Sequence, residues 1–293
     1  MDSYITIRIK ATEVNQLDSH LIVGGPKITA AHGLLTALAI KLLPDNRPED
    51  AANKLKGFVY IHHNRVMKSM LDTTYKNRLY PQQRRGAFAF SKNDYVGSTT
   101  SQGLQPVATA DMEVTLIAQI EIKVDSEKVQ SALSGKRFGG GLIRSVKTSV
   151  FQNFEDACTS IPGGFFVLDR RDLLQHENKV EAMRSILLKE HGEPFVALAT
   201  VGFALLNDLR EQAGAIHGYP HAFSEPAIGA IQYISKNQNK RPLGDYLFKA
   251  QCSPNKLWVL AQEHSDLNER DGFEDSIFDP DAIDLDALTD LSA

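Results

Sequence analysis

Cysteine, tryptophan and long apolar runs are scarce in this sequence, and each scarcity narrows the classes of protein to which it can belong. Its two cysteines, Cys158 and Cys252, are too few and too far apart for a disulfide framework or a zinc knuckle, so we expect reduced, unpaired thiols. The apolar stretch Phe195–Leu206 falls short of the about 18 to 20 residues that a membrane span needs and is interrupted by glycine. Residues Met1 to Tyr4 lack the cationic and apolar regions of a signal peptide. The sequence therefore predicts a cytoplasmic protein without a membrane span.

Common catalytic and metal-binding motifs are also missing. The sequence has no Gly-x-Ser-x-Gly elbow, no Gly-x-x-x-x-Gly-Lys-Ser/Thr loop and no Gly-x-Gly-x-x-Gly fingerprint. His217 and His221 have the spacing of metal ligands on a helix, but the glycine and proline between them disfavour a helix. The acidic run Asp279–Asp286 lacks the central glycine and the terminal glutamate of a calcium loop. We therefore expect neither a metal nor a cofactor.

The net charge of −4 hides two parts of opposite sign. Residues 263–293 contain eleven acidic residues and one basic residue, a net charge of −10, whereas residues 1–262 contain 31 basic and 25 acidic residues, a net charge of +6. This division predicts a basic body, residues 1–262, that binds a polyanion, and a flexible acidic tail, residues 263–293, that shields the basic surface or docks on a basic partner. A solvated tail without a partner is the plainer alternative.

The spacing of apolar residues predicts an α+β chain. Ile5, Ile7 and Ile9 alternate with polar residues, which is typical of a strand with one buried face and a cationic outer face. Strands separated by single helices, with a long polar insertion at about 63–110, favour a ferredoxin-like or RNA-recognition-type (RAMP) fold. The predicted strands are Tyr4–Lys10, Phe58–His62, Thr115–Val124, Gly164–Leu168 and Phe195–Leu206, and the predicted helices are Ala30–Leu43, Lys179–Lys189 and Ala227–Ile234.

Three consecutive glycines between cationic residues form the most informative motif. A loop without Cβ atoms lets a polyanion lie on backbone N–H groups, and flanking cations add attraction. A flexible hairpin turn is the alternative interpretation. The motif predicts a cradle for a nucleic-acid backbone, formed by Lys136, Arg137, Gly139, Gly140, Gly141 and Arg144.

The insertion combines basic and aromatic residues. From His62 to Lys92 it contains seven basic residues against one acid, Asp72, with tyrosines and phenylalanines interleaved. Basic side chains neutralise phosphates and aromatic faces stack on bases, so this mixture is typical of nucleic-acid binding. The alternative is an ordinary surface loop whose aromatic side chains pack on the core. The candidate contacts to RNA or target DNA are Lys76, Arg78, Arg84 and Arg85.

The adjacent histidines His62 and His63 leave an enzymatic alternative open. Two histidines serve an RNA-cleaving site as general base and general acid, because their pKa lies near neutral pH. An RNA endonuclease using His62 or His63 with Tyr60 or Lys68 is therefore a second hypothesis.

Five segments between roughly residues 4 and 260 follow one another in the order of a known family pattern: Ile22–Leu38, Ala110–Ile122, Arg137–Ile143, Pro162–Leu174 and Phe223–Ala230. Together they resemble the Cas-five-type (Csy-two) subunit of type I-F CRISPR surveillance complexes. Only one tryptophan, Trp258, is present where the family has more, and the acidic tail has no counterpart in the family pattern.

The resemblance implies a non-catalytic RNA-binding protein. It would cap the 5′ handle of a CRISPR RNA, join the neighbouring backbone subunit and other effector subunits, and help to recognise target DNA, while base pairing reads the sequence. Lys27 and His32 join the glycine loop as candidate RNA contacts, with Arg8 and Lys10 on the first strand. The alternatives are the sister backbone subunit, a repeat-processing endonuclease, and an assembly or inhibitor protein whose tail mimics nucleic acid.

Overall fold

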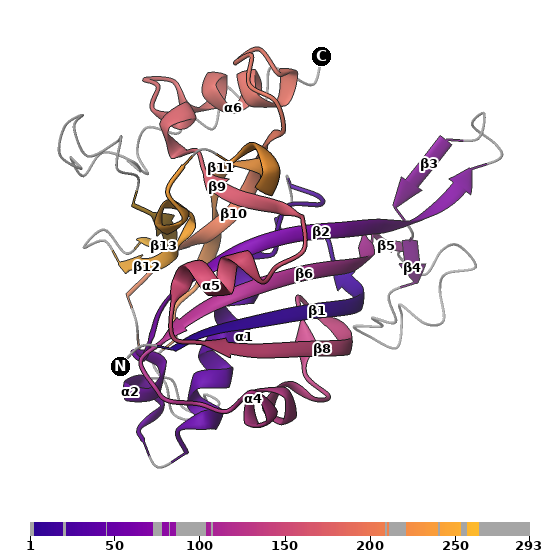
Figure 1. Cartoon of the computed structure of the whole chain (residues 1–293). Coiled ribbons are helices and arrows are strands. Elements are labelled where there is room, and N and C mark those ends of the chain that lie inside the picture. Colours follow the sequence, from indigo (N-terminus) through magenta and orange to yellow (C-terminus); the bar gives the residue numbers. More distant parts are fainter. Residues whose placement is uncertain are drawn as a thin grey trace, which may run out of the picture.

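The chain has an α+β fold in which antiparallel strands predominate (Figure 1). The computed structural model describes residues 3–19, 22–44, 46–72, 78–81, 83–85, 104–106, 108–208, 210, 221–239, 241–252 and 257–263, with the backbone alone for those between 69 and 106. The α+β class that the sequence predicts is confirmed. Within the described residues, no helix is both long enough and apolar enough to cross a membrane.

The helices and strands follow one another in a mixed order. The helices are α1 (Ile28–Leu42), α2 (Pro48–Ala52), α4 (Ser126–Leu133), α5 (Phe154–Thr159) and α6 (Lys179–Leu188), with short 3₁₀ turns η1 (Arg171–Leu174), η3 (Lys236–Gln238) and η4 (Leu243–Tyr246). The strands are β1 (Ser3–Asn15), β2 (Leu55–Asp72), β3 (Arg78–Pro81), β4 (Gln83–Arg85), β5 (Leu104–Pro106), β6 (Thr109–Ile120), β7 (Arg137–Phe138), β8 (Gly141–Phe151), β9 (Phe165–Asp169), β10 (Val196–Leu205), β11 (Ser224–Ser235), β12 (Phe248–Cys252) and β13 (Leu257–Gln262).

One long sheet organises the molecule. Its strand order is β12-β13-β10-β11-β9-β2-β6-β1-β8-β7, and β3 pairs with β2 beyond the main path. A pairing of Phe248 with Phe58 joins β12 back to β2, which closes β12, β13, β10, β11, β9 and β2 into a ring. Strands β4 and β5 form a separate two-stranded sheet. The hairpin of β7 and β8 therefore lies at the open end of the long sheet.

One face of the sheet is covered by helices α1 and α4. Ile5, Ile7 and Ile9 of β1 are fully buried there, as their alternation predicts, and pack in one cluster with Leu35 of α1 and Val129 of α4. Each such aliphatic side chain contributes about 1.5–3 kcal/mol on burial. This cluster holds β1 in register and so fixes the cationic residues on its opposite face.

The opposite face is only partly covered. Helix α5 packs over one end of it, with Ala157 and Cys158 against Val59 and Ile117 (Figure 1). Beyond α5, β1 presents Arg8 and Lys10, whose side chains are 37% and 61% exposed. No helix lies over this part of β6, β1 and β8 in Figure 1. The cationic outer face predicted for the first strand is confirmed.

Most predicted helices and strands are confirmed, but one predicted helix is a strand. The strand predicted at Phe58–His62 is a longer strand that continues to Asp72, so the first ten residues of the expected insertion belong to the sheet. The helix predicted at Ala227–Ile234 is wrong, because these residues lie in strand β11. Strand β11 lies between β10 and β9 and buries residues on both faces, and the resulting nearly continuous apolar run also matches helical spacing.

Candidate nucleic-acid interface

Two of the sequence motifs meet in space at the β7–β8 hairpin. Gly139 and Gly140 have positive φ angles of 52° and 81° and form the turn. The Gly139 carbonyl accepts a hydrogen bond from the Asn15 N–H at 2.9 Å. A Cβ atom on Gly139 would lie 2.9 Å from Val14 Cγ1 and 3.6 Å from Lys27 Cγ. The glycine motif and the segment that opens α1 are thus in contact, although more than a hundred residues separate them in the chain.

The glycines allow close packing against β1 as well as an exposed backbone. Gly141 is buried, and a Cβ atom there would lie 2.5 Å from the Thr12 carbonyl oxygen and 2.6 Å from the Val14 nitrogen. The expectation that Gly141 offers its backbone to a polyanion is therefore wrong, since the backbone of β1 occupies that space. Gly140 is exposed and Gly139 is half-buried. Only the tip of the hairpin retains the open backbone that a cradle requires.

Four exposed cations lie on or beside the two strands of this hairpin, with Lys147 further along β8 opposite Arg8 of β1, and we call them the cationic hairpin surface. The Arg137 Nη1 donates to the Gly140 carbonyl at 3.1 Å, and the Arg144 Nε donates to Thr12 Oγ1 at 3.1 Å. Residues 128–154 contain five basic residues and no acid. Positive charge therefore accumulates at this edge. The cationic hairpin surface comprises Lys136, Arg137, Arg144 and Lys147.

Arg8 and Lys10 lie beside this surface, but both form ion pairs with the same glutamate. The Arg8 Nη2 and Lys10 Nζ approach the carboxylate of Glu113 on β6 at 2.6 and 3.4 Å. Partial burial opposes ionisation of Glu113, but the hydrogen bond and the charges of these two cations prevail and lower its pKa. The sheet face next to the hairpin therefore carries a smaller positive surplus than the sequence alone predicts.

Lys27 does not reach solvent, contrary to the expectation that it contacts RNA. Its side chain is 3% exposed, and its Nζ lies 2.6 Å from Asp18 Oδ1. Burial raises the pKa of Asp18 and lowers the pKa of Lys27, while the attraction between the two charges opposes both shifts. Lys27 therefore acts as an internal ion-pair partner that anchors the loop preceding α1. No sequence pattern indicated Asp18 as its partner.

His32, another candidate RNA contact, is half-buried and its ring packs against aromatic side chains. Its ring lies 5.1 Å from the ring of Trp258 in an edge-to-face arrangement and 6.3 Å from that of Phe58. Thr36 Oγ1 lies 3.5 Å from its Nδ1. Burial lowers the pKa of His32. Its role in this structure is to pack α1 on the sheet.

The histidine pair of the endonuclease hypothesis is split between the two faces of β2. His62 lies 5.6 Å from Tyr233, ring to ring, on the α1 side, and its buried Nδ1 has no hydrogen-bond partner among the described residues. His63 lies on the opposite side, with its Nε2 2.7 Å from Thr115 Oγ1. Of the proposed companions, Tyr60 is fully buried and Lys68 is paired with Asp111. The structure does not bring these groups together as an acid–base pair.

His62→Gln is expected to reduce the loss of stability on acidification. Burial, followed by the charges of Arg65 and His63, lowers the pKa of His62 to about 4. An unfolded histidine titrates near about 6.5, so the unfolded state binds a proton that the folded state excludes. The stabilisation is complete above about pH 6.5 and is lost as the pH falls toward about 4, by on the order of 2 kcal/mol after allowance for partial exposure. Thermal unfolding over this range, with the exposed His176→Gln as control, measures it; identical pH dependence in both variants would contradict the assignment.

The insertion candidates remain predictions. Lys76 lies outside the described residues. Arg78 begins β3, where its backbone pairs with Asp72 of β2, and Arg84 and Arg85 lie in β4, which pairs with β5. Arg78 therefore lies on a strand paired with the far end of β2, which projects from the main sheet in Figure 1, whereas Arg84 and Arg85 lie in the separate two-stranded sheet.

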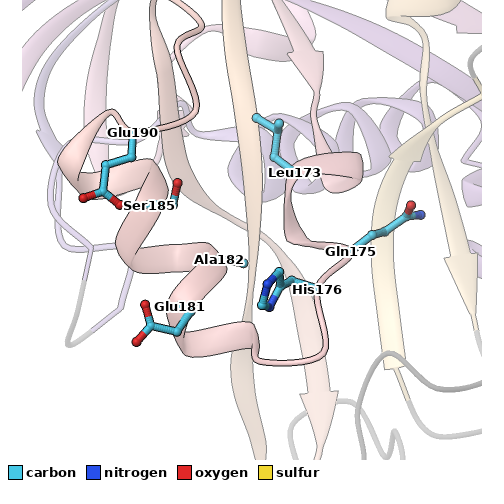
Figure 2. Close-up of a pocket in the computed structure, with 7 residues that line it drawn as sticks. All are labelled: Leu173, Gln175, His176, Glu181, Ala182, Ser185 and Glu190. Carbon is cyan, nitrogen blue, oxygen red and sulfur yellow. The ribbon is translucent and has the colours of Figure 1, made fainter.

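A separate hollow of about 320 Å³ lies between η1 and α6 (Figure 2). Two glutamates and a histidine approach it, and no lysine or arginine lines it. Its charge does not suit a polyanion, so it does not extend the candidate interface. The lining residues are Leu173, Gln175, His176, Glu181, Ala182, Ser185 and Glu190.

Together, fold and surface define an α+β protein with a long antiparallel sheet and an exposed cationic hairpin suited to a polyanion. Comparison with protein families gives a match to the family described as CRISPR-associated protein (Cas_Csy2) over residues 5–190, well over half of the chain. The chain belongs to this CRISPR-associated family. Membership indicates a role in a type I-F CRISPR complex, and the resemblance inferred from the sequence motifs is confirmed.

Solved structures add a more distant likeness. A CRISPR protein from Archaeoglobus fulgidus, known from a crystal structure, aligns over 90% of this chain and 100% of its own, with 9% identity and a TM-score of 0.30. A comparison with curated proteins gave no match.

Proposed function

We propose that this protein is a non-catalytic RNA-binding subunit of a type I-F-like CRISPR ribonucleoprotein that caps the 5′ handle of the guide RNA. The observation that carries the proposal is the cationic hairpin surface, four exposed cations along a hairpin with a glycine turn, in a stretch without acidic residues. Phosphates are bound by such cations and by exposed backbone N–H groups. Membership of a CRISPR-associated family supplies the biological setting.

The position of the hairpin favours binding of the end of an RNA chain over binding of its middle. It forms the last pairing of the long sheet, and its turn lies beside Asn15 at the end of β1, with Gly140 exposed. The uncapped start of α1 lies behind it through the contact of Lys27 with Gly139, so the positive end of that helix adds to the local potential. We further propose a RAMP-like relationship for the strands around β1, and contacts to a neighbouring backbone subunit, other effector subunits and target DNA.

The other readings have less support. A repeat-processing endonuclease built on His62 and His63 lacks its acid–base pair, because the two rings lie on opposite faces of β2. The sister backbone subunit would share the cationic surface but contact the guide along its length. The two subunit roles predict different footprints, one at the 5′ handle and one repeated along the spacer.

Co-purification tests the proposed function directly. The tagged full-length protein is expressed with its genomic neighbours and a repeat-spacer transcript, and the retained RNA is sequenced and mapped by crosslinking. A discrete RNA that crosslinks through its repeat-derived 5′ handle supports capping. Crosslinks spread along the spacer would favour the backbone role, and no RNA or random RNA would overturn the proposal.

Lys136→Gln with Arg144→Gln is expected to weaken handle binding by about 25-fold at about 0.1 M salt and to reduce the salt slope by about 1.4, if each side chain neutralises one phosphate of a single strand. Arg137 is left unchanged because it holds the turn through Gly140. The matched control neutralises two exposed cations of α6, Lys179 and Arg184. Equal affinity of both double variants would remove the hairpin from the interface.

A further inference from the structure

We propose that the acidic tail, residues 264–293, docks within the same molecule on the cationic hairpin surface and there competes with nucleic acid. The docking itself does not depend on the proposed function. Only the identity of the competitor rests on it.

The cationic hairpin surface lacks acidic partners within the described part of the chain. None of its four members forms an ion pair there, whereas Arg8, Lys10 and Lys68 on the adjoining strands all do. Arg137 and Arg144 donate only to neutral oxygens, a carbonyl and a hydroxyl. Four uncompensated positive charges therefore face solvent at one edge of the sheet.

The tail has the complementary charge and a suitable pattern. Residues 264–293 contain ten acidic residues and one basic residue. In the run Ile283–Asp286, acidic and apolar residues alternate, so one side of an extended segment would carry the carboxylates. The exposed apolar residues Val180 and Leu187 of α6 offer another docking face, but Glu181 and Glu190 lie beside it and would repel the tail. Charge therefore assigns the tail to the hairpin.

The length of the tail permits this contact. The described chain ends after β13 at Glu263, which is held by an ion pair with Lys249 at 2.8 Å. The strand order places β13 eight strands from β7, roughly 38 Å at about 4.8 Å per strand. Thirty further residues span about 30 Å root-mean-square as a flexible chain and reach about 100 Å when extended. Because the tail belongs to the same chain, its effective concentration at the hairpin is about 1 mM. An intrinsic dissociation constant of about 0.1 mM for the docked tail then leaves the cationic hairpin surface about 90% occupied. The apparent affinity for a competing polyanion then falls by about 10-fold.

Zero-length carbodiimide crosslinking of the full-length protein, without RNA, tests the docking. Lys136 and Lys147 are expected to join tail carboxylates within the monomer at low salt, and the yield should fall steeply at about 0.5 M salt because the contact is electrostatic. The exposed lysines of α6, Lys179 and Lys189, serve as internal controls. Crosslinks that are absent, that favour the α6 lysines, or that occur only between copies would overturn the proposal.

Charge-neutralised tails test the competition in the same full-length chain. Changing Asp279, Asp281, Asp284 and Asp286 to asparagine is expected to raise affinity for single-stranded RNA by up to about 10-fold at low salt, with the gain lost at high salt. Changing four exposed carboxylates of the body, Glu155, Glu177, Glu181 and Glu190, to glutamine is the control for the same change in net charge. An unchanged affinity would overturn the competition, whereas intramolecular crosslinks in a protein that binds no RNA would keep the docking and refute the proposed function.

Discussion

Replacing Lys27 with methionine is expected to lower the free energy of unfolding by about 3–5 kcal/mol at neutral pH. The substitution keeps the size of the side chain but leaves Asp18, 2.6 Å away in the wild type, as a buried charge without its cation. Urea unfolding measures the loss. Because burial already raises the pKa of Asp18, the carboxyl of the variant takes up a proton more readily on acidification than it does in the unfolded chain. The destabilisation should therefore shrink as the pH falls toward the raised pKa.

A double-mutant cycle separates the ion pair from simple loss of packing. Asp18→Asn combined with Lys27→Met should restore part of the stability, with a coupling energy of about 0.5–3 kcal/mol, because neither charge is then left alone. Lys10→Met, which removes a 61% exposed cation, should cost less than about 1 kcal/mol. If Lys27 instead served RNA, its variant would keep full stability and lose affinity.

This ion pair shows why the sequence identified the right segment but the wrong role. The motif around Lys27 was recognisable from its glycine, proline and helix signals, and the structure places it against the glycine turn as a shared site requires. Its partner Asp18 lies across a loop, so no helical or strand spacing connects the two residues. A lysine and an aspartate in polar loops look solvated until tertiary packing buries them.

The elements were predictable where one face of an element is buried. The alternation in β1 and the leucine spacing in α1 gave correct types, with nearly correct bounds for α1, whereas β1 continues past the predicted end at Lys10 to Asn15. Strand β11 was misread because burial on both faces removes the alternation that distinguishes a strand. Lys147, which no motif singled out, completes the cationic hairpin surface. The sequence signal for it was the absence of acids from residues 128–154.

The glycine run was predictable as a motif, but the division of labour among its members was not. Whether a glycine in such a run is exposed or supports a close backbone contact depends on the strand beside it, and β1 is distant in sequence. Alanine substitutions at Gly140 and Gly141 should therefore lower the stability of the protein by different amounts.

Gly141→Ala is expected to destabilise the protein by about 3 kcal/mol or more. The new Cβ atom would lie 2.5 Å from the Thr12 carbonyl oxygen and 2.6 Å from the Val14 nitrogen, and both are backbone atoms that cannot rotate away. Relief requires β8 to separate from β1 near the hairpin, with loss of pairing and of the packing it holds. Thermal or urea unfolding reports the loss of stability, and amide hydrogen exchange locates it along β1 and β8.

Two other glycine-to-alanine substitutions in the same chain provide losses of stability with which the effect of Gly141→Ala can be compared. Gly140→Ala meets only Asn15 Cβ at 3.8 Å, so its cost comes from its φ of 81° and should be about 1–2 kcal/mol. Gly33→Ala, in α1 with no atom within 4 Å of the new Cβ, should stabilise the protein by about 0.5–1 kcal/mol. A Gly141 variant no less stable than the Gly140 variant would contradict the close contact with β1. The cradle interpretation would then regain Gly141, because its backbone would have the room that a bound polyanion needs.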